Sequence, residues 1–382
     1  MISRAHRSPL SDWWWTVDRP MITVVLVLLL TGVVFSFAAS PPVAERLDLD
    51  SLHFVVRHAV YVPVALAVML GLSLFSPRQV RRTALTLLVV CLAMLVMVLF
   101  LGQEIKGSRR WLFIAGMSVQ PSELIKGPFI VITAWLFAEG SRRPDVPGKM
   151  LAVALLVIVA ALLVAEPDLG QTVLFVAVWS ALFFLAGVNT WVVAGLGGLG
   201  VAGMFSAYYA FPHVAERINR FLDPESGDNF QIMTAMQSFE RGGWSGTGPG
   251  EGIMKRVLPD SHTDFVFAVV GEEFGIFLCL LIVVLFSVLV MRALMQALRR
   301  NSDFERMAIA GLACQIGIQA FINMGVNLHL LPAKGMTLPF ISYGGSALLS
   351  AAMTMGFLLA LSRRSVEQRV AVAPRRPVAA EA

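Results

Sequence analysis

Long stretches without a charged side chain dominate this sequence. Met21–Ala39, Thr83–Leu101 and Trp191–Phe211 contain no Asp, Glu, Lys or Arg. A helix needs about 20 apolar residues to cross the hydrocarbon core of a bilayer. A helix that packs on a soluble core instead shows polar residues at helical spacing, and these runs show none. They therefore predict helices that span a membrane.

The composition of the chain supports the same conclusion. Of its 382 residues, 57% are hydrophobic and only 14% are charged, against about 25% charged residues in soluble domains. The net charge is +5, but the basic residues flank the apolar runs, as membrane orientation requires. We therefore expect no nucleic-acid partner. Cys91, Cys279 and Cys314 each lie inside an apolar run and are interpreted as small buried side chains.

The runs predict an all-α polytopic membrane protein of about ten transmembrane helices. The expected spans are 21–39, 57–75, 83–102, 122–138, 150–165, 171–187, 191–211, 264–291, 307–330 and 341–362. They form one transmembrane domain over 21–362, which follows an N-terminal segment at 1–20. Residues 212–263, between helices 7 and 8, are too polar to span and form a large extracytoplasmic loop. The tail at 363–382 is rich in Ala, Pro and Arg and is expected to be disordered.

Lysine and arginine counts orient these spans, because cytoplasmic segments carry an excess of both residues. With the N-terminus inside, inner segments hold 18 of the 30 basic residues and outer segments hold the other 12. Five of those 12 lie in the long loop, which need not follow the rule, and this leaves 18 against 7. Both termini are therefore expected in the cytoplasm, with the protein in the cytoplasmic (inner) membrane and its polar segments on the outer side.

Asp264 is the first candidate for chemistry, because it stands where the long outer loop enters an apolar helix. A carboxylate at this position is costly unless it serves a water-filled cavity or pairs with a cation. The alternative is a helix N-cap, for which Thr263 also qualifies. Glu272 lies about 80° around the helix and about 12 Å further along, so it can line the same cavity. For Glu273 we expect an ion pair with a lysine of a neighbouring helix.

A second group of candidates is cationic. Lys106, Arg109 and Arg110 precede Trp111 in an outer segment, against the usual charge bias. Lysine and arginine bind phosphates through charge-assisted hydrogen bonds, and an indole can stack on a sugar. The alternative is a solvated loop with an interfacial tryptophan.

Carboxylates and cations also begin other spans. Glu123 and Lys126 are three residues apart at a helix start, where an ion pair is more often structural than catalytic. Glu166 and Asp168 flank Pro167 in a tight outer turn. Two carboxylates alone are a weak metal signal, so we assign no cofactor, although a divalent cation is compatible with the pair.

Glycine and proline interrupt the apolar stretch 331–346, which contains Lys334 and Ser342. Broken backbone at membrane depth is tolerated where it lines a cavity. Six glycines between Gly242 and Gly252 can bend backbone amides toward a phosphate, but without a Gly-Lys-Ser/Thr element they are no P-loop. A flexible loop is the simpler interpretation.

Together, these segments resemble the SEDS family (shape, elongation, division and sporulation), from Asp18 to Arg364. The most specific matches are His262–Phe265 followed by Gly271–Gly275, and Ile341–Ser346. Within the family, Asn327–Gly335 is more similar to the cell-division member than to the elongation member. His329, Met336 and the Gly248–Gly252 stretch depart from the family pattern.

The resemblance implies a peptidoglycan glycosyltransferase that polymerises lipid II for septal wall synthesis. It implies that Asp264 is the essential carboxylate and that Trp111 belongs to the cavity. It also implies a class B penicillin-binding protein and other divisome membrane proteins as partners. Glycosyl transfer from a diphosphate needs a base and cations. We expect Asp264 to be the base, with cations from Lys106, Arg109, Arg110, Lys255 and Lys334. The structural or cavity-lining set is Glu123, Lys126, Glu166, Asp168, Glu272 and Ser342.

Two other functions compete with this one. A lipid II flippase must open to both sides, and it would carry cations at the midplane and on inner loops. The cavity candidates here are all on the outer side, which favours the polymerase. A scaffold that only activates the penicillin-binding protein is the third hypothesis.

Overall fold

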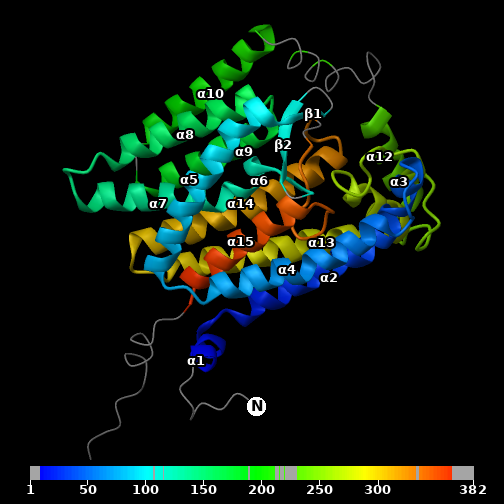
Figure 1. Cartoon of the computed structure of the whole chain (residues 1–382), viewed down its shortest axis with the longest axis horizontal. Helices are drawn as coiled ribbons and strands as arrows, with labels where there is room; N and C mark the ends of the chain where they lie inside the picture. The colour runs from blue at the N-terminus through cyan, green and yellow to red at the C-terminus, as the bar shows by residue number, and fades with distance from the viewer. Residues whose placement is uncertain are drawn as a thin grey trace, which may run out of the picture.

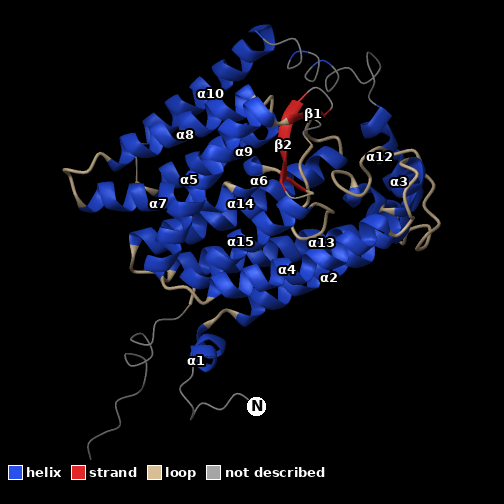
Figure 2. Cartoon of the chain, viewed as in Figure 1, coloured by secondary structure: helices blue, strands red, loops and turns tan. Residues whose placement is uncertain are grey.

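The computed structural model describes residues 9–105, 108–114, 116–187, 190–210, 230–332 and 335–363, with Ala215 and Asn219. Its described part is a bundle of long helices with a small sheet and an irregular loop region near one end (Figures 1 and 2). The long helices are α2 (Arg19–Ala39), α4 (His53–Ser73), α5 (Pro77–Leu101), α7 (Lys126–Arg142), α8 (Gly148–Ala165), α9 (Leu169–Leu185), α10 (Thr190–Ala210), α13 (Val266–Leu298), α14 (Asp303–Asn327) and α15 (Gly345–Leu361). The shorter ones are α1 (Pro9–Thr16), α3 (Pro41–Arg46), α6 (Pro121–Leu124), α12 (Phe230–Gly242) and the 3₁₀ turn η1 (Met254–Arg256).

A helix lies at each of the ten ranges expected to span. Seven of the described helices are long and apolar enough to cross a membrane: α2, α4, α5, α6 with α7, α8, α13 and α14. The helices α9 and α15 are apolar but shorter. The chain is therefore a polytopic helical membrane protein, while the count of ten spans stays a prediction. The expected N-terminal residues 1–8, most of 211–229 and the tail beyond Arg363 lie outside the described residues.

Local sequence explains how several helices begin. Asp18 caps α2 by accepting a hydrogen bond from the Met21 N–H at 3.2 Å. Ser76 and Gln79 form a capping box at the start of α5, and Pro77 occupies the first turn. Both devices satisfy backbone N–H groups that the helix itself leaves without partners.

The helix α14 is central to the bundle. It packs against α7, α9, α13 and α15, and most of its residues are buried. The helix α15 lies against α4, and α13 lies against α2 and α12 (Figure 1). Polar side chains on α14 therefore meet other helices rather than lipid.

The connection 103–121 is expected to be a loop in an all-α protein, but it contains a three-stranded antiparallel sheet. Strands β1 (Gln103–Ile105), β2 (Ser108–Ile114) and β3 (Met117–Val119) are ordered β1-β2-β3 (Figure 2). A seven-residue strand that mixes cations with aromatic and β-branched residues suits a half-exposed sheet, and in β2 only Leu112 is buried. The sequence analysis relied on long apolar runs, and these strands are too short and too polar to form one.

Candidate functional site

Asp264 lies at the junction between a tight turn and α13. Its backbone N–H donates to the Asp260 carbonyl at 3.1 Å, and its side chain is half-buried. The N-cap of α13 is Phe265, so Asp264 precedes the cap position. The N-cap alternative for Asp264 or Thr263 therefore differs from the structure, in which Phe265 holds that position.

Two asparagines of α14 hold the backbone of Asp264. The carbonyl of Asp264 accepts hydrogen bonds from Asn323 Nδ2 at 2.8 Å and from Asn327 Nδ2 at 3.0 Å. The Oδ1 atom of Asn327 also accepts from the Ala268 N–H at 3.1 Å, in the first turn of α13. Both asparagines are buried, and each Nδ2 group donates two hydrogen bonds, which holds the backbone around it. The position of Asp264 is thus set by α14.

The loop between α14 and α15 lies beside Asp264. A Cβ atom at Gly335 would stand 3.5 Å from Asp264 Oδ2. The carbonyl of Met336 accepts from Asn323 Nδ2 at 2.6 Å, so one asparagine amide holds both this loop and Asp264. Ser342 closes the loop, because its Oγ accepts from the Leu338 N–H at 2.9 Å. The predicted interruption at 331–346 is therefore an ordered loop in its described part.

The amides on α14 form a stripe at four-residue spacing. Its members are Gln315, Gln319, Asn323 and Asn327, all buried. Gln319 Nε2 donates to the Thr337 carbonyl at 3.0 Å, and its Oε1 accepts from Gln315 Nε2 at 2.8 Å. The sequence interpretation missed this stripe, although four amides at this spacing inside an apolar span are a signal that periodicity can find.

The expected ion pair at the start of the fourth span is present. Lys126 Nζ lies 2.8 Å from Glu123 Oε2, and both side chains are almost fully buried. Lys126 Nζ also donates to Gln319 Oε1 at 3.0 Å, and Gln171 Nε2 donates to Glu123 Oε1 at 2.5 Å. The pair therefore joins α6 and α7 to α9 and α14.

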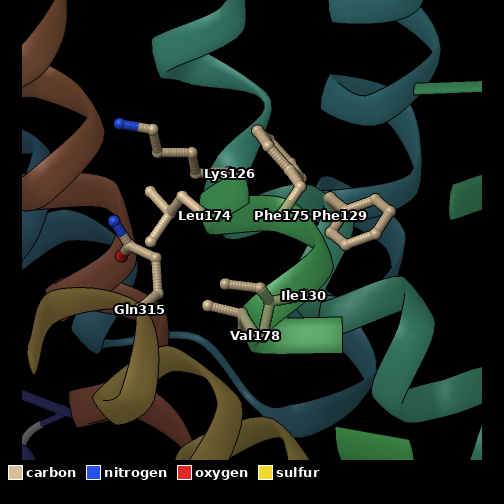
Figure 3. Close-up of a pocket in the computed structure, with 7 residues that line it drawn as sticks. All are labelled: Lys126, Phe129, Ile130, Leu174, Phe175, Val178 and Gln315. Carbon is tan, nitrogen blue, oxygen red and sulfur yellow. The ribbon is translucent and has the colours of Figure 1, made fainter. Parts of the chain in front are cut away.

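A cavity of about 10 Å³ adjoins this pair. Apolar side chains of α7 and α9 line most of it, and Lys126 and Gln315 supply the polar atoms (Figure 3). In Figure 3, these two polar side chains lie on one side of the cavity and the rings of Phe129 and Phe175 on the other. Its small size and apolar walls make it a packing defect within the bundle rather than a substrate site.

The turn that carries Glu166 and Asp168 is held by Arg110 of β2. The Arg110 guanidinium donates to the carbonyls of Pro167 and Glu166, and it lies 3.9 Å from Asp168 Oδ1. Asp168 caps α9 by accepting from the Gln171 N–H at 3.4 Å. Arg110 thereby ties the sheet that contains Trp111 to the start of α9.

Both carboxyls of this turn have raised pKa values. The pKa of Glu166 is raised to about 8, mainly by burial and also by the charge of Asp168, while Arg110 opposes the shift. Burial also raises the pKa of Asp168, against the opposing effect of Arg110. Glu166 is fully buried, and neither side-chain oxygen has a hydrogen-bond partner among the described residues. This environment favours a neutral Glu166 over a metal-binding carboxylate.

Lys255 and Glu273 form a second buried ion pair, which attaches the outer loop to α13. Glu273 does pair with a lysine, but that lysine comes from η1 rather than from a neighbouring long helix. The adjacent Glu272 accepts from the Ile253 and Met254 N–H groups at 2.8 and 3.0 Å. Both glutamates are buried, so Glu272 holds the loop in place.

The loop fills a break in α13. Gly275 has φ 80° and ψ 178°, which interrupts the helix. The Ile276 N–H donates to the Gly243 carbonyl at 3.0 Å, and the carbonyls of Glu272 and Glu273 accept from the N–H groups of Thr247 and Gly248. The Gly-rich segment therefore satisfies backbone groups that the break exposes, as buried polar backbone requires. The structure uses these glycines for close packing.

The predicted cations fall into three groups. Arg110 and Lys255 are engaged by carboxylates and carbonyls, as described above. Arg109 is exposed and lies 3.7 Å from Glu104, while Trp111 is half-buried and pairs with Gln103 across the sheet. Lys106 and Lys334 lie outside the described residues.

A further cation near the site escaped the sequence analysis. Arg57, in the second turn of α4, forms a side-chain hydrogen bond with Tyr343. The backbone N–H of Tyr343 donates to the His262 carbonyl at 3.0 Å, two residues before Asp264. Arg57 thus stands at the edge of the site, although no motif singled it out.

The described residues assemble a carboxylate on a fixed backbone, next to an ordered loop and close to aromatic and cationic side chains. No three His, Cys, Asp or Glu side chains in the described ranges are grouped so that they could hold a metal ion. A positioned carboxylate of this kind can take a proton from a hydroxyl group.

Comparisons with known proteins bear on this site. Residues 18–367 match a family model described as cell cycle protein and named for FtsW, RodA and SpoVE. The chain is 43% identical over 363 residues to the probable peptidoglycan glycosyltransferase FtsW of Caulobacter vibrioides, and the match covers 95% of this chain and 93% of the relative. The corresponding protein of Idiomarina loihiensis is 35% identical, with 93% and 89% covered.

Solved structures give the same picture. A chain from a structure on the coordination of polymerization and crosslinking by a peptidoglycan synthase complex matches with a TM-score of 0.76 and 26% identity. The rod shape determining protein RodA of Thermus thermophilus matches with a TM-score of 0.67 and 26% identity. Each match covers 91% of this chain and 97% of the other.

Proposed function

The chain belongs to the FtsW, RodA and SpoVE family of cell cycle proteins, and from this premise we propose that it is a septal peptidoglycan glycosyltransferase. Its relatives are named for this activity at up to 43% identity over nearly the whole chain. Its substrate is lipid II, an undecaprenyl-diphosphate-linked disaccharide, which it polymerises at the outer face of the cytoplasmic membrane.

The observation that carries this proposal is the placement of Asp264. Its backbone is fixed by Asn323 and Asn327, and its carboxyl lies beside Gly335 at the edge of the outer loop region. A general base must be held within hydrogen-bond reach of the hydroxyl that it deprotonates. Rigid second-layer contacts of this kind provide that geometry.

The reaction is a single displacement at the donor MurNAc C1. The 4-hydroxyl oxygen of the acceptor GlcNAc forms the new bond to C1 while Asp264 takes its proton. The bond from C1 to the diphosphate oxygen breaks, and undecaprenyl diphosphate leaves with the electron pair. The configuration at C1 is inverted.

Cations stabilise the negative charge that collects on the leaving diphosphate. Among the described candidates, Arg109 on β2 is the most available to the diphosphate. Its side chain is exposed, whereas Arg110 and Lys255 already have buried partners. Lys106 and Lys334 stay candidates from the sequence. The polyprenyl tails lie in lipid, so the substrate enters sideways between helices.

The partner in this proposal is a class B penicillin-binding protein, which crosslinks the glycan. The match to a chain from a peptidoglycan synthase complex supports this assignment. Other divisome membrane proteins complete the assembly at the division septum. Both termini face the cytoplasm, as the excess of inner lysine and arginine indicates.

The test is to incubate the purified full-length chain, alone and with its transpeptidase partner, with lipid II and no other polymerase. We expect glycan strands on a gel from the parent protein and none from Asp264→Asn, which keeps the size of the side chain but removes the base. Both proteins must elute as monodisperse species. Normal polymer from Asp264→Asn refutes the assignment of the base.

A transport assay separates this function from the flippase alternative. Vesicles that contain the parent protein and labelled lipid II on one leaflet should form polymer without moving lipid II across. Lipid II flux without polymer would overturn the glycosyltransferase. Division activity retained by Asp264→Ala in cells would instead favour a scaffold.

A further inference from the structure

The buried ion pair of Glu123 and Lys126 lies away from bulk solvent, and its contacts lead toward Asp264. Both side chains are nearly inaccessible, and the Lys126 ammonium contacts Glu123 at 2.8 Å and Gln319 Oε1 at 3.0 Å. A buried charge of this kind is stable only when it is paired and hydrogen-bonded. The Lys126 ammonium is therefore occupied by protein groups and is not open to a diphosphate.

Gln319 connects this pair to the loop beside Asp264. An ammonium group only donates hydrogen bonds, so the atom of Gln319 that faces Lys126 is its oxygen. The Nε2 group then faces the Thr337 carbonyl, to which it donates at 3.0 Å. Lys126 and Gln315 both donate to the Gln319 oxygen. These two donors fix the orientation of the amide.

One turn along α14, Asn323 holds the preceding residue of the same loop. Its Nδ2 group donates to the Met336 carbonyl at 2.6 Å and to the Asp264 carbonyl at 2.8 Å. The loop segment Gly335–Thr337 is therefore attached to α14 at two successive carbonyls. The first attachment is shared with Asp264 and the second with the buried lysine.

We propose that Gln319 is a positioning residue for the reaction, through which the buried Glu123–Lys126 pair holds the loop 335–337 against Asp264. The pair contributes to polymerisation by fixing this amide, and it does not bind the substrate diphosphate. The inference rests on the proposed glycosyltransferase function for its kinetic consequence, while the structural link can be measured without activity.

The kinetic test compares Gln319→Leu, Lys126→Met and the double variant in the purified full-length chain with lipid II. Each single variant should lower kcat about tenfold or more, with KM within about twofold of the parent, because only the reacting geometry is lost. Since both act through one link, the double variant should be no slower than the slower single variant, within about threefold. A substrate-binding lysine would instead raise KM, and its effect would multiply with that of Gln319→Leu.

Thr133→Val is the matched control. Thr133 lies on α7 with Lys126, is fully buried, and its hydroxyl has no hydrogen-bond partner among the described residues. The change is nearly isosteric, so kcat and KM should stay within about twofold of the parent. A loss in this control equal to that of Lys126→Met would show that any polar change in α7 suffices, and it would overturn the proposal.

A second measurement follows the loop itself and needs no catalysis. Thr337→Cys is introduced after Cys91, Cys279 and Cys314 are replaced by alanine, and maleimide labelling is timed in detergent. Adding Lys126→Met or Gln319→Leu should speed labelling about tenfold, because local opening exposes the thiol, whereas Thr133→Val should not. Unchanged labelling in both variants refutes the link. A parent that labels as expected but makes no glycan refutes the proposed function alone.

Discussion

Among the residues that the structure describes, two lysine–glutamate pairs are buried, and their surroundings differ. Lys126 pairs with Glu123 within one stretch of helix, and their other partners are the side-chain amides of Gln171 and Gln319. Lys255 pairs with Glu273 across the junction between the outer loop and α13. There the other partner is the backbone N–H of Gly250. The first pair joins helices to one another, and the second anchors a loop.

The difference shows that the chemistry of an ion pair does not decide its structural effect. Amide side chains carry a further donor or acceptor, so the first pair influences the more distant loop beside Asp264. A backbone N–H group has no further donor or acceptor to pass on a contact. The second pair therefore stabilises only the loop that contains Gly250. Four variants test this comparison.

The largest expected effect is that of Glu123→Leu. It leaves the Lys126 ammonium, whose side chain is 1% exposed, without a counter-charge, and breaking a buried pair in this way costs about 3–5 kcal/mol. Unfolding of the purified protein in detergent measures the loss. The comparison fails if Glu123→Leu lowers the free energy of unfolding by no more than Glu273→Leu does.

Glu273→Leu should cost less, about 1–3 kcal/mol. The Lys255 side chain is 7% exposed and lies in the outer loop, where it can turn toward water. Its characteristic effect is local. Hydrogen exchange followed by mass spectrometry should show faster exchange at Gly250 and its neighbours, with little change in α14. Equal exchange in both regions would contradict the anchoring of a loop alone.

Gly275→Ala tests whether the loop depends on the break in α13. The backbone at Gly275 is of a kind that residues with a Cβ adopt at a cost of about 1–3 kcal/mol, and the new Cβ would meet the Trp244 carbonyl at 2.4 Å. We expect a lower melting temperature and faster exchange in 242–248. Gly71→Ala is the control, since a Cβ there meets nothing within 4 Å and should not destabilise the helix.

The last prediction is a pH dependence and concerns Glu166, in the turn next to the first pair. Its folded pKa of about 8 lies above the ordinary value of 4.5, so the folded state holds the proton more tightly than the unfolded state. This contribution to stability is fully present below pH 4.5 and is lost as the pH rises through 8, at no more than about 1.4 kcal/mol per pH unit. Melting temperatures of Glu166→Gln between pH 5 and 8.5 should fall less steeply than those of the parent. If the melting temperatures of the variant and the parent fall equally with pH, Glu166 is not the group that causes the pH dependence.

The sequence predicted the helices well, because their signal is local. An apolar run such as Met21–Ala39 must be helical in lipid, where every backbone group needs a partner within the segment. It also identified the pair of Glu123 and Lys126, whose three-residue spacing is enough to bring the two side chains together. The family motifs indicated Asp264, but its role as the base stays a prediction.

Other features depended on residues far apart in the chain. The partner of Lys255 could not be inferred from spacing, and the sequence analysis assigned this lysine to the diphosphate. Arg110 was assigned in the same way, yet the structure holds it against the turn at Glu166. A cation can pair with any carboxylate that the fold brings near it, and the charge pattern alone does not rank those choices.

The sequence by itself determined that this chain is a polytopic membrane protein, and it predicts which side carries the polar segments, because hydropathy and charge bias act on each segment separately. The tertiary structure decided which amides of α14 meet Asp264, the loop at Gly335 and the buried lysine. Hydrogen bonds are directional and short, so these partnerships exist only once the helices have packed.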